Sequence, residues 1–208
     1  FRADVFREIM TSDSEDVTSK HDVGGDIIPK LVNEGVAQVY DYNDNVVPGE
    51  TGSDNHYWRD VGTLDSYYDA HMDLVAPLPA FSLYNDQWPI YTRGLTEPPA
   101  KIADGADGPS HISNTILSNG VIVSGGSCRD SILSRDVIVD AGAEVNRSVL
   151  MGNVKVGKGA RLNRCIVDKN VVVPPGFSIG HDQQADSERF LLSANGVVAV
   201  PKNYKIEE

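Results

Sequence analysis

The sequence predicts a left-handed parallel β-helix of the hexapeptide-repeat type in its second half, preceded by the tail of an α/β domain. Three observations lead to this prediction. Between Thr115 and Gly180 the chain repeats itself with a period of about 17 residues. Aliphatic residues recur at fixed places in each repeat, and a glycine or proline turn follows them. Before Thr115 there is no such period, and helical and extended patterns alternate.

Four consecutive units carry the repeat, beginning at Thr115, Ser131, Ser148 and Cys165. Each divides into three pieces of five or six residues, and three short strands with turns between them close one triangular coil. The inward column is predicted from the aliphatic second place of each unit and from the valine that opens the next cluster: Ile116, Ile132, Val149 and Ile166, then Val121, Val137, Val154 and Val171. Glycines at the corners are expected to take positive φ: Gly125, Gly142, Gly157 and Gly159. The alternative, a four-stranded sandwich, requires antiparallel hairpins.

The first half predicts a different architecture. We expect helices at Ala3–Met10, Asp26–Glu34 and Leu64–Val75, strands at Val36–Tyr42 and His56–Val61, and a polar loop at Asp44–Asn55. Gly35 is expected to end the second helix. These strands are too few for a closed sheet, so we expect its other strands to lie upstream of Phe1.

The division into domains follows from these patterns. We expect the end of an α/β domain at 1–76, an interdomain linker at 77–110, and a β-helix domain with a C-terminal tail at 111–208. The linker is expected to be ordered, because its apolar side chains are too many for a free tether: Phe81, Leu83, Tyr84, Trp88, Ile90 and Tyr91. In the tail, Ser187–Tyr204 predicts a short helix, and Val197–Val200 is expected to cover the open edge of the last coil.

Charge and composition exclude several classes of function. The net charge of −12 disfavours binding to nucleic acid or to an anionic membrane. No apolar run approaches the roughly 20 residues needed to span a bilayer. The two cysteines, Cys128 and Cys165, predict reduced, partly buried thiols in a cytoplasmic protein. The opening Phe1-Arg2-Ala3 lacks a signal peptide and a Met, which leads us to expect a piece of a longer protein.

Several strings in this chain resemble those of ADP-glucose pyrophosphorylases, the glucose-1-phosphate adenylyltransferases. They are HDVGGDIIPKL at His21–Leu31, YWRDVGTLDSYYDAHMDL at Tyr57–Leu74, NDQWPIYT at Asn85–Thr92, PPAKI at Pro98–Ile102 and GVVAVPK at Gly196–Lys202. The resemblance implies the C-terminal remnant of an α/β nucleotidyltransferase domain before the β-helix. It also implies transfer of an adenylyl group from ATP to glucose 1-phosphate, giving ADP-glucose and pyrophosphate for glycogen synthesis.

The resemblance gives Asp60 a catalytic role, because it matches the aspartate that helps to hold magnesium in this family. Magnesium prefers carboxylate ligands and bridges phosphate oxygens, which neutralises their charge during the reaction. The competing reading of Asp60 is a turn carboxylate that caps the helix beginning near Leu64.

The resemblance also implies allosteric regulation by a sugar-phosphate activator and a nucleotide inhibitor, in a homotetramer. Lys169 matches a basic residue of the inhibitor site, and Lys202 matches one that binds the activator phosphate. Trp58 is expected to relay regulation to the active site. The competing readings are solvated lysines and a packed tryptophan. Asn203-Tyr204-Lys205 replaces a more basic tail, which puts the identity of the activator in doubt.

Other features predict less. His21-Asp22 reads as a local hydrogen bond and Gly24-Gly25 as a turn, since the spacing of a phosphate loop is absent. The 208 residues contain neither the family's glycine-rich nucleotide loop nor its sugar-phosphate Glu-Lys pair, so the chain alone is expected to be inactive. The alternatives are a noncatalytic regulatory and oligomerisation module, a hexapeptide-repeat acyltransferase, and a sugar nucleotidyltransferase using another nucleotide.

Overall fold

The computed structural model describes residues 1–50, 52, 56–92, 94 and 96–207. The chain divides into two compact units, Phe1–Asn45 and Val46–Glu208. No helix in the described part of the chain is long and apolar enough to cross a membrane.

The first unit contains short helices. They are α1 (Ala3–Glu15), a π-type turn η1 (Val23–Ile27), α2 (Ile28–Asn33) and a 3-10 turn η2 (Tyr42–Asp44). The helix at the N-terminus is therefore five residues longer than expected. As predicted, Gly35 ends α2: it takes a φ of +72°, and the Val36 amide donates to the Leu31 carbonyl at 3.1 Å.

Two predicted strands of the first half are wrong. Val36–Tyr42 and His56–Val61 contain no strand in the structure. Val39 is 97% exposed and Tyr40 is 73% exposed. A strand exists only beside a partner that satisfies its amides and carbonyls, and the described residues supply none here. The β-propensity of these residues without a partner therefore leaves them outside any strand.

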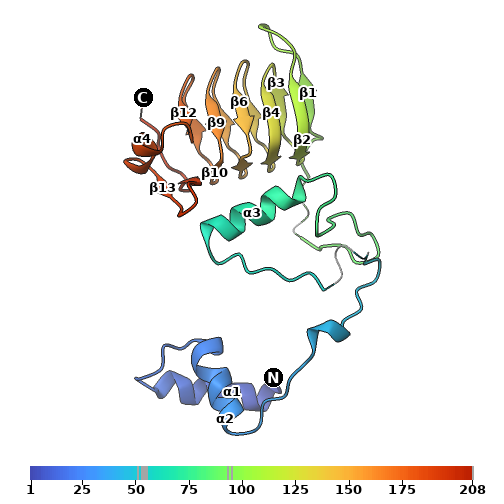
Figure 1. The fold of residues 1–208 in the computed structure, drawn as a ribbon, viewed down its shortest axis with the longest axis vertical. Helices are drawn as coiled ribbons and strands as arrows, with labels where there is room; N and C mark the ends of the chain where they lie inside the picture. Colours follow the sequence, from blue (N-terminus) through green and yellow to red (C-terminus); the bar gives the residue numbers. More distant parts are fainter. Residues whose placement is uncertain (51, 53–55, 93, 95, 208) are drawn as a thin grey trace. The chain divides into compact units, whose positions relative to one another are not determined.

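The second half is a parallel β-solenoid, as predicted (Figure 1). One face is a five-stranded sheet of β1 (Lys101–Ala103), β3 (Ile122–Ser124), β5 (Ile138–Val139), β8 (Lys155–Val156) and β11 (Val172–Val173). We call it face A. All of its pairings are parallel, with Val123, Val139 and Val156 in one register column. The sandwich alternative is therefore excluded.

The other two faces belong to one sheet folded at a corner. Face B contains β6 (Glu144–Asn146), β9 (Arg161–Asn163) and β12 (Ser178–Ile179). Face C contains β7 (Val149–Leu150), β10 (Cys165–Val167) and β14 (Val198–Val200). The long strands β2 (His111–Leu117) and β4 (Ser127–Leu133) span both faces. The bend lies at Asn114 and Asp130, whose φ values are +43° and +48°.

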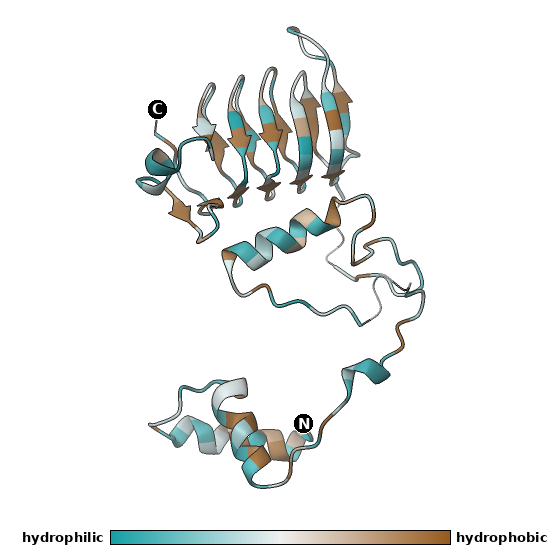
Figure 2. Cartoon of the chain, in the orientation of Figure 1, coloured by the Kyte–Doolittle hydropathy of each residue, from teal (hydrophilic) through white to brown (hydrophobic). Residues whose placement is uncertain are grey.

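The core is the column of aliphatic side chains that point into the coils. Figure 2 shows hydrophobic residues recurring along the strands of the solenoid. Val121, Val137, Val154 and Val171 are fully buried, as predicted. The second-place residues differ, because Val149 and Ile166 pack outward on face C, against a helix. The residues after them, Leu150 and Val167, fill the interior.

The corners confirm three of the four glycine predictions. Gly125, Gly142 and Gly159 have φ of +70°, +69° and +68°. Gly157 does not take a positive φ. Glycine is required there for space instead, since a Cβ would lie 2.7 Å from the Pro175 nitrogen and 2.9 Å from the Val173 carbonyl oxygen. The close approach of the next coil explains this residue.

One helix packs on the outside of the solenoid. Helix α3 (Leu64–Leu74) lies along face C, and its Tyr68 is 1% exposed among Val149, Ile166 and Val197. The Tyr68 hydroxyl donates to the Arg147 carbonyl at 2.7 Å, and the Arg164 guanidinium lies 5.3 Å from the ring centre. This places α3 firmly on the second unit's coils.

The tail closes the last coil, as expected, but its helix lies earlier in the chain. Helix α4 spans Gln183–Ser187, and β13 (Leu191–Leu192) then pairs antiparallel with β14. β14 pairs parallel with β10, so it extends face C by one strand. The exposed edge of β10 is thereby satisfied.

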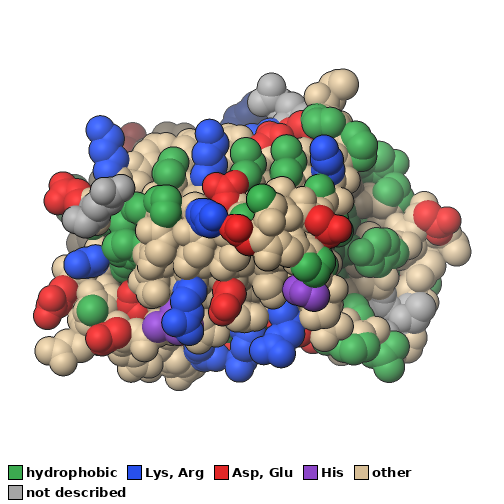
Figure 3. Space-filling model, turned by 90° about the horizontal axis from the view of Figure 1, so that it is seen from above, with side chains coloured by type: hydrophobic (Ala, Val, Ile, Leu, Met, Phe, Trp, Pro, Cys, Tyr) green, Lys and Arg blue, Asp and Glu red, His purple; other side chains and the backbone are tan. Residues whose placement is uncertain are grey.

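The surface of face A carries an apolar row. Ile122, Ile138, Lys155 and Val172 share one register column and point outward. Figure 3 shows hydrophobic side chains in a row interrupted by basic ones. Ile122 is 39% exposed and Val172 is 57% exposed. This row is therefore separate from the core.

Burial differs between the linker and the thiols. Three aromatic residues of the linker, Tyr84, Trp88 and Tyr91, are 84%, 59% and 92% exposed. The thiols are more buried than expected, at 1% for Cys128 and 0% for Cys165, and both are free. Their surroundings are aliphatic because both point into the coils.

Candidate functional site

The first part of the site is the loop that precedes α3. The Gly62 amide donates to Asp60 Oδ1 at 3.0 Å, and a Cβ on Gly62 would lie 3.2 Å from that oxygen. Glycine therefore lets the backbone wrap closely around the carboxylate. The carboxylate itself is on an exposed residue.

Thr63, rather than Asp60, caps α3. The Ser66 amide donates to Thr63 Oγ1 at 3.1 Å, and the Thr63 amide donates to Ser66 Oγ at 3.1 Å. The reading of Asp60 as a helix cap is wrong. Asp60 has only a local turn to stabilise, which leaves its charge exposed to a ligand.

A single carboxylate fits one part of a magnesium site. The described residues contain no group of three or more His, Cys, Asp or Glu side chains able to hold a metal. Magnesium is commonly held by one or two carboxylates together with substrate phosphates. Asp60 is thus suited to supply one ligand, with the others coming from elsewhere.

The neighbours of Asp60 differ from expectation. Trp58 is 74% exposed, so the reading of it as a packed core residue is wrong. Tyr57 instead stacks on Phe81, with ring centres 5.0 Å apart. Trp58 thus presents an indole to solvent beside the exposed carboxylate.

The second part of the site is a row of basic residues along one corner of the solenoid, which we call the basic row. The Asn203 amide donates to the Lys169 carbonyl at 2.9 Å, and Val167 pairs with Val200. Lys169 and Lys202 therefore occupy equivalent positions, each two residues past the end of a strand of face C. The structure brings together two residues that are 33 positions apart in the sequence.

Arg135 belongs to the same row, two coils before Lys169. The Asn153 amide donates to the Arg135 carbonyl and the Asn170 amide to the Gly152 carbonyl, which continues the ladder. The Arg135 side chain extends across Gly152, where a Cβ would lie 3.4 Å from Arg135 Nε. Glycine at that position leaves room for the arginine to reach along the row.

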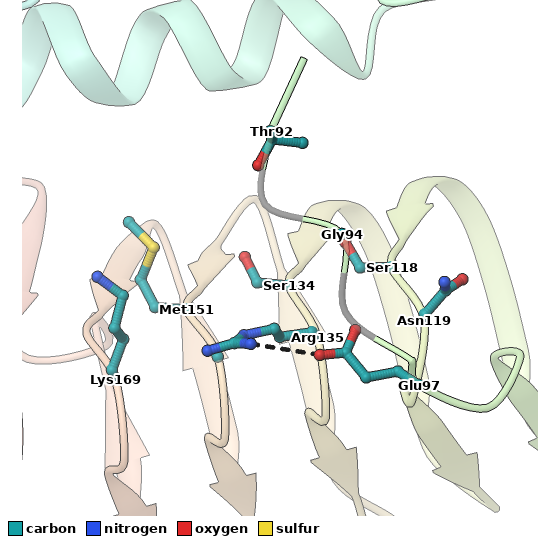
Figure 4. Close-up of a pocket in the computed structure, with 10 residues that line it drawn as sticks. Thr92, Gly94, Glu97, Ser118, Asn119, Ser134, Arg135, Met151 and Lys169 are labelled. Carbon is teal, nitrogen blue, oxygen red and sulfur yellow. Dashed lines mark hydrogen bonds and ion pairs between the residues drawn. The ribbon is translucent and has the colours of Figure 1, made fainter. Parts of the chain in front are cut away.

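A cleft of about 750 Å³ runs beside this row (Figure 4). Arg135 points into it from one coil, and Lys169 borders it from another. Ser118 and Ser134 add hydroxyl groups to its lining. Arg135 Nη1 lies 3.3 Å from Glu97 Oε1. The cleft therefore combines two cations and hydroxyl groups with one internal carboxylate.

A second cleft, of about 500 Å³, connects the row with the Asp60 loop. Its lining includes Val61–Thr63 from the loop, Met151 and Lys169 from the coils, and Pro201 next to Lys202. Burial, followed by the nearby Asp168 carboxylate, raises the pKa of Tyr67, which also lines this cleft. Tyr67 is therefore a neutral hydroxyl at neutral pH.

The remaining candidates have structural roles in the described residues. His21 Nδ1 lies 2.9 Å from Asp13 Oδ2 instead of pairing with Asp22. Asp22 accepts from the Gly25 amide and is the N-cap of η1, so the glycine pair lies within that helical segment and not in the predicted turn. Burial raises the pKa of Cys128 and of Cys165 to about 12, which makes both thiols poor nucleophiles.

Sequence reasoning missed Arg135, although the repeat contained the signal. SILSRD, SVLMGN and CIVDKN place Arg135, Gly152 and Lys169 at the fifth position of successive units. VAVPKN, from Val198 to Asn203, places Lys202 at the same position. Aligning every polar position of the repeat, as well as the aliphatic ones, would have shown the row.

Two families of known proteins match different parts of the chain. Residues 98–200 match a family described as GlmU-like, C-terminal hexapeptide, and residues 1–76 match the nucleotidyl transferase family.

Curated relatives match almost the whole chain. A glucose-1-phosphate adenylyltransferase of Corynebacterium jeikeium is 48% identical over 204 residues, covering 98% of this chain and 49% of the relative. Those of Corynebacterium kroppenstedtii and Mycobacteroides abscessus are 54% and 55% identical over 207 and 195 residues. These alignments cover 99% and 94% of this chain, and 49% and 47% of the relatives. The chain spans about half the length of the curated relatives it matches.

Proposed function

Because this chain belongs to the glucose-1-phosphate adenylyltransferase family, we propose that it is part of an enzyme that makes ADP-glucose and pyrophosphate from ATP and glucose 1-phosphate. The observation that carries this proposal is the identity of about 50% to proteins of that name over nearly all of the chain. The proposal places the enzyme in the cytoplasm, in glycogen synthesis. The proposal also includes the domain boundaries at residues 76 and 110, which separate the end of the α/β domain, the linker and the β-helix domain.

Asp60 supplies one carboxylate to a magnesium ion in the complete enzyme. When bound, the ion neutralises phosphate oxygens that would otherwise repel one another as one phosphate attacks the other. The chain's own contribution is to hold the carboxylate in place: the Gly62 amide orients Oδ1, and the capped start of α3 fixes the end of the loop that precedes it. Both features support the role of Asp60.

Replacing Asp60 with Asn tests this role. We expect Asp60→Asn in the complete enzyme to lower kcat by about 100-fold or more, because a neutral amide is a weak magnesium ligand. Asp69→Asn, on the exposed side of α3, removes the same charge as a matched control and should leave kcat near the wild-type value. Near-normal turnover of Asp60→Asn would remove Asp60 from the mechanism.

The basic row binds the phosphate of a regulator. Lys169 and Lys202 lie side by side through the Asn203–Lys169 bond, and the cleft beside Lys169 adjoins the Asp60 loop. This adjacency supports a nucleotide inhibitor and a sugar-phosphate activator at one corner, near the reacting groups. Trp58 is proposed to respond to their binding, and the complete enzyme to assemble as a homotetramer.

The chain by itself supports a second candidate function, as a noncatalytic regulatory and oligomerisation module. The solenoid, its closed last coil and the basic row are all within these 208 residues. The acyltransferase reading has less support, because no histidine lies between His111 and His181 to serve as a base on the coils. Pyrophosphate release by the purified chain would argue against the module reading, and acetyl-CoA binding would favour the acyltransferase.

A further inference from the structure

Helix α3 is bound to the tail hairpin by a carboxylate. Asp65, in the first turn of α3, accepts from Ser193 Oγ at 2.5 Å and from the Asn195 amide at 3.3 Å. Asp65 and Ser193 are 128 positions apart in the sequence, and Ser193 is half-buried. Hydrogen bonds to a charged carboxylate are among the stronger ones in proteins.

The hairpin that receives Asp65 is itself fixed. The Ser193 amide donates to the Val197 carbonyl at 2.9 Å, and the Val197 amide donates to Ser193 Oγ at 2.9 Å. Arg164 Nη2 donates to the Asn195 carbonyl at 3.2 Å, which anchors the turn on the coil beneath. Ser193 Oγ thus joins the helix and the hairpin through one atom.

The path continues from Asp65 back to the candidate metal ligand. Thr63 and Ser66 form the capping box on either side of Asp65, and the Gly62 amide bonds to Asp60. The segment from Asp60 to Ser66 is therefore braced internally. A movement of Asp65 would carry the Asp60 carboxylate with it.

In the other direction the path reaches the basic row. The hairpin continues into β14, which ends at Val200 and is followed by Pro201 and Lys202. The Asp168 amide donates to the Val200 carbonyl at 3.0 Å, which ties this strand to the coil bearing Lys169. The strand that leads to Lys202 thus begins at the hairpin that holds Asp65.

We infer that Asp65 is a positioning residue that fixes the Asp60 loop on the last coil through Ser193 and Asn195. The pair of contacts links the row that binds the regulator to the loop that holds the metal ligand. Its importance for catalysis rests on the proposed function, but the mechanical link is a property of this chain alone.

Hydrogen exchange of the 208-residue chain tests the link without any ligand. Ser193→Ala removes the hydroxyl that bonds Asp65. We expect exchange of the amides from Gly62 to Tyr67 to become about tenfold faster, the change that loss of a hydrogen bond to a charged group typically makes to an opening equilibrium. Amides of β7 and β10 should keep their protection. Ser193→Thr, which retains the hydroxyl, should restore slow exchange.

Ser187→Ala is the matched control, because Ser187 Oγ bonds only locally to the Gln184 carbonyl within the tail. It should leave the exchange of the α3 start unchanged. Unaltered exchange in Ser193→Ala, or equal acceleration in both variants, would overturn the inference. Acceleration that spreads through β7 and β10 would show general destabilisation and would also count against it.

A second measurement separates this inference from the proposed function. In the complete enzyme, Ser193→Ala should raise the magnesium concentration needed for half-maximal rate by about tenfold, as loss of a residue that orients a metal ligand does. The melting temperature should stay near that of Ser187→Ala. An unchanged magnesium requirement alongside faster exchange would leave the link standing and contradict the metal role of Asp60. Unchanged slow exchange in Ser193→Ala together with an inactive Asp60→Asn would contradict the link and leave the metal role of Asp60 standing.

Discussion

At the scale of residues, the basic row shows how a repeat turns distant side chains into neighbours. Arg135, Lys169 and Lys202 share one position of the coil, and Gly152 leaves space for the arginine. The sequence predicted the two lysines by resemblance and missed the arginine. The competing reading of Trp58 as a packed residue is wrong, because exposure depends on what the rest of the fold places over a side chain.

The row predicts a difference between two lysines. Lys169→Ala should weaken binding of pyrophosphate to the 208-residue chain by up to about fivefold, since an exposed ion pair is worth up to about 1 kcal/mol. Lys155→Ala is the control, because Lys155 points outward on face A. Calorimetric titration of each variant measures the affinity. Equal losses from both variants would show that only net charge matters and that the row is no site.

At the scale of elements, the strongly periodic part of the chain was predictable and the rest was less so. The solenoid strands form within a period of about 17 residues, so each strand meets its partner on the next coil. Helix α3 was also predicted, since a helix satisfies its own amides. The prediction of a strand at Val36–Tyr42 failed because a strand depends on a partner elsewhere in the chain. The cap at Thr63 was not predicted because the usual capping box has Glu or Gln three residues later, and this chain has Ser66 there.

The packing of α3 on face C predicts the effect of one hydroxyl group. Tyr68→Phe should lower the free energy of unfolding by about 1 kcal/mol, because the Arg147 carbonyl loses its donor while the ring stays buried. Urea unfolding followed by circular dichroism measures the change. Tyr84→Phe serves as the control, since Tyr84 is 84% exposed. A loss of equal size in Tyr84→Phe would mean that the buried bond contributes nothing specific.

At the scale of the whole molecule, the end of the solenoid is closed by a buried acid. Asp186 is 5% exposed and accepts from the Gly180 amide at 2.8 Å, where face B ends. Burial raises the pKa of Asp186, and the Gly180 bond opposes part of that rise. The folded state therefore prefers the protonated carboxyl more than the unfolded state does. Its contribution to stability is present below the unfolded pKa, about 3.9, and is lost as pH rises through the folded pKa.

This sign predicts the pH dependence of a variant. Asp186→Asn keeps an oxygen acceptor for Gly180 and carries no charge at any pH. Its melting temperature should exceed that of the wild-type chain at pH 7, and the difference should vanish as the pH falls below about 4. Scanning calorimetry from pH 3.5 to pH 7 measures it. Asp140→Asn, on an exposed residue, removes one charge as a control. A gap that stays constant with pH, or that matches the control, would contradict the assignment.

The ladder that carries Arg135, Lys169 and Lys202 also acts as a molecular ruler. Neighbouring strands of a sheet are about 4.8 Å apart, so the anchor points of these cations are separated by whole numbers of that step. Gain or loss of one complete coil would keep every inward side chain in register and change only the interval between the arginine and the lysines. A solenoid can therefore alter the spacing of its surface cations in discrete increments, without changing its interior.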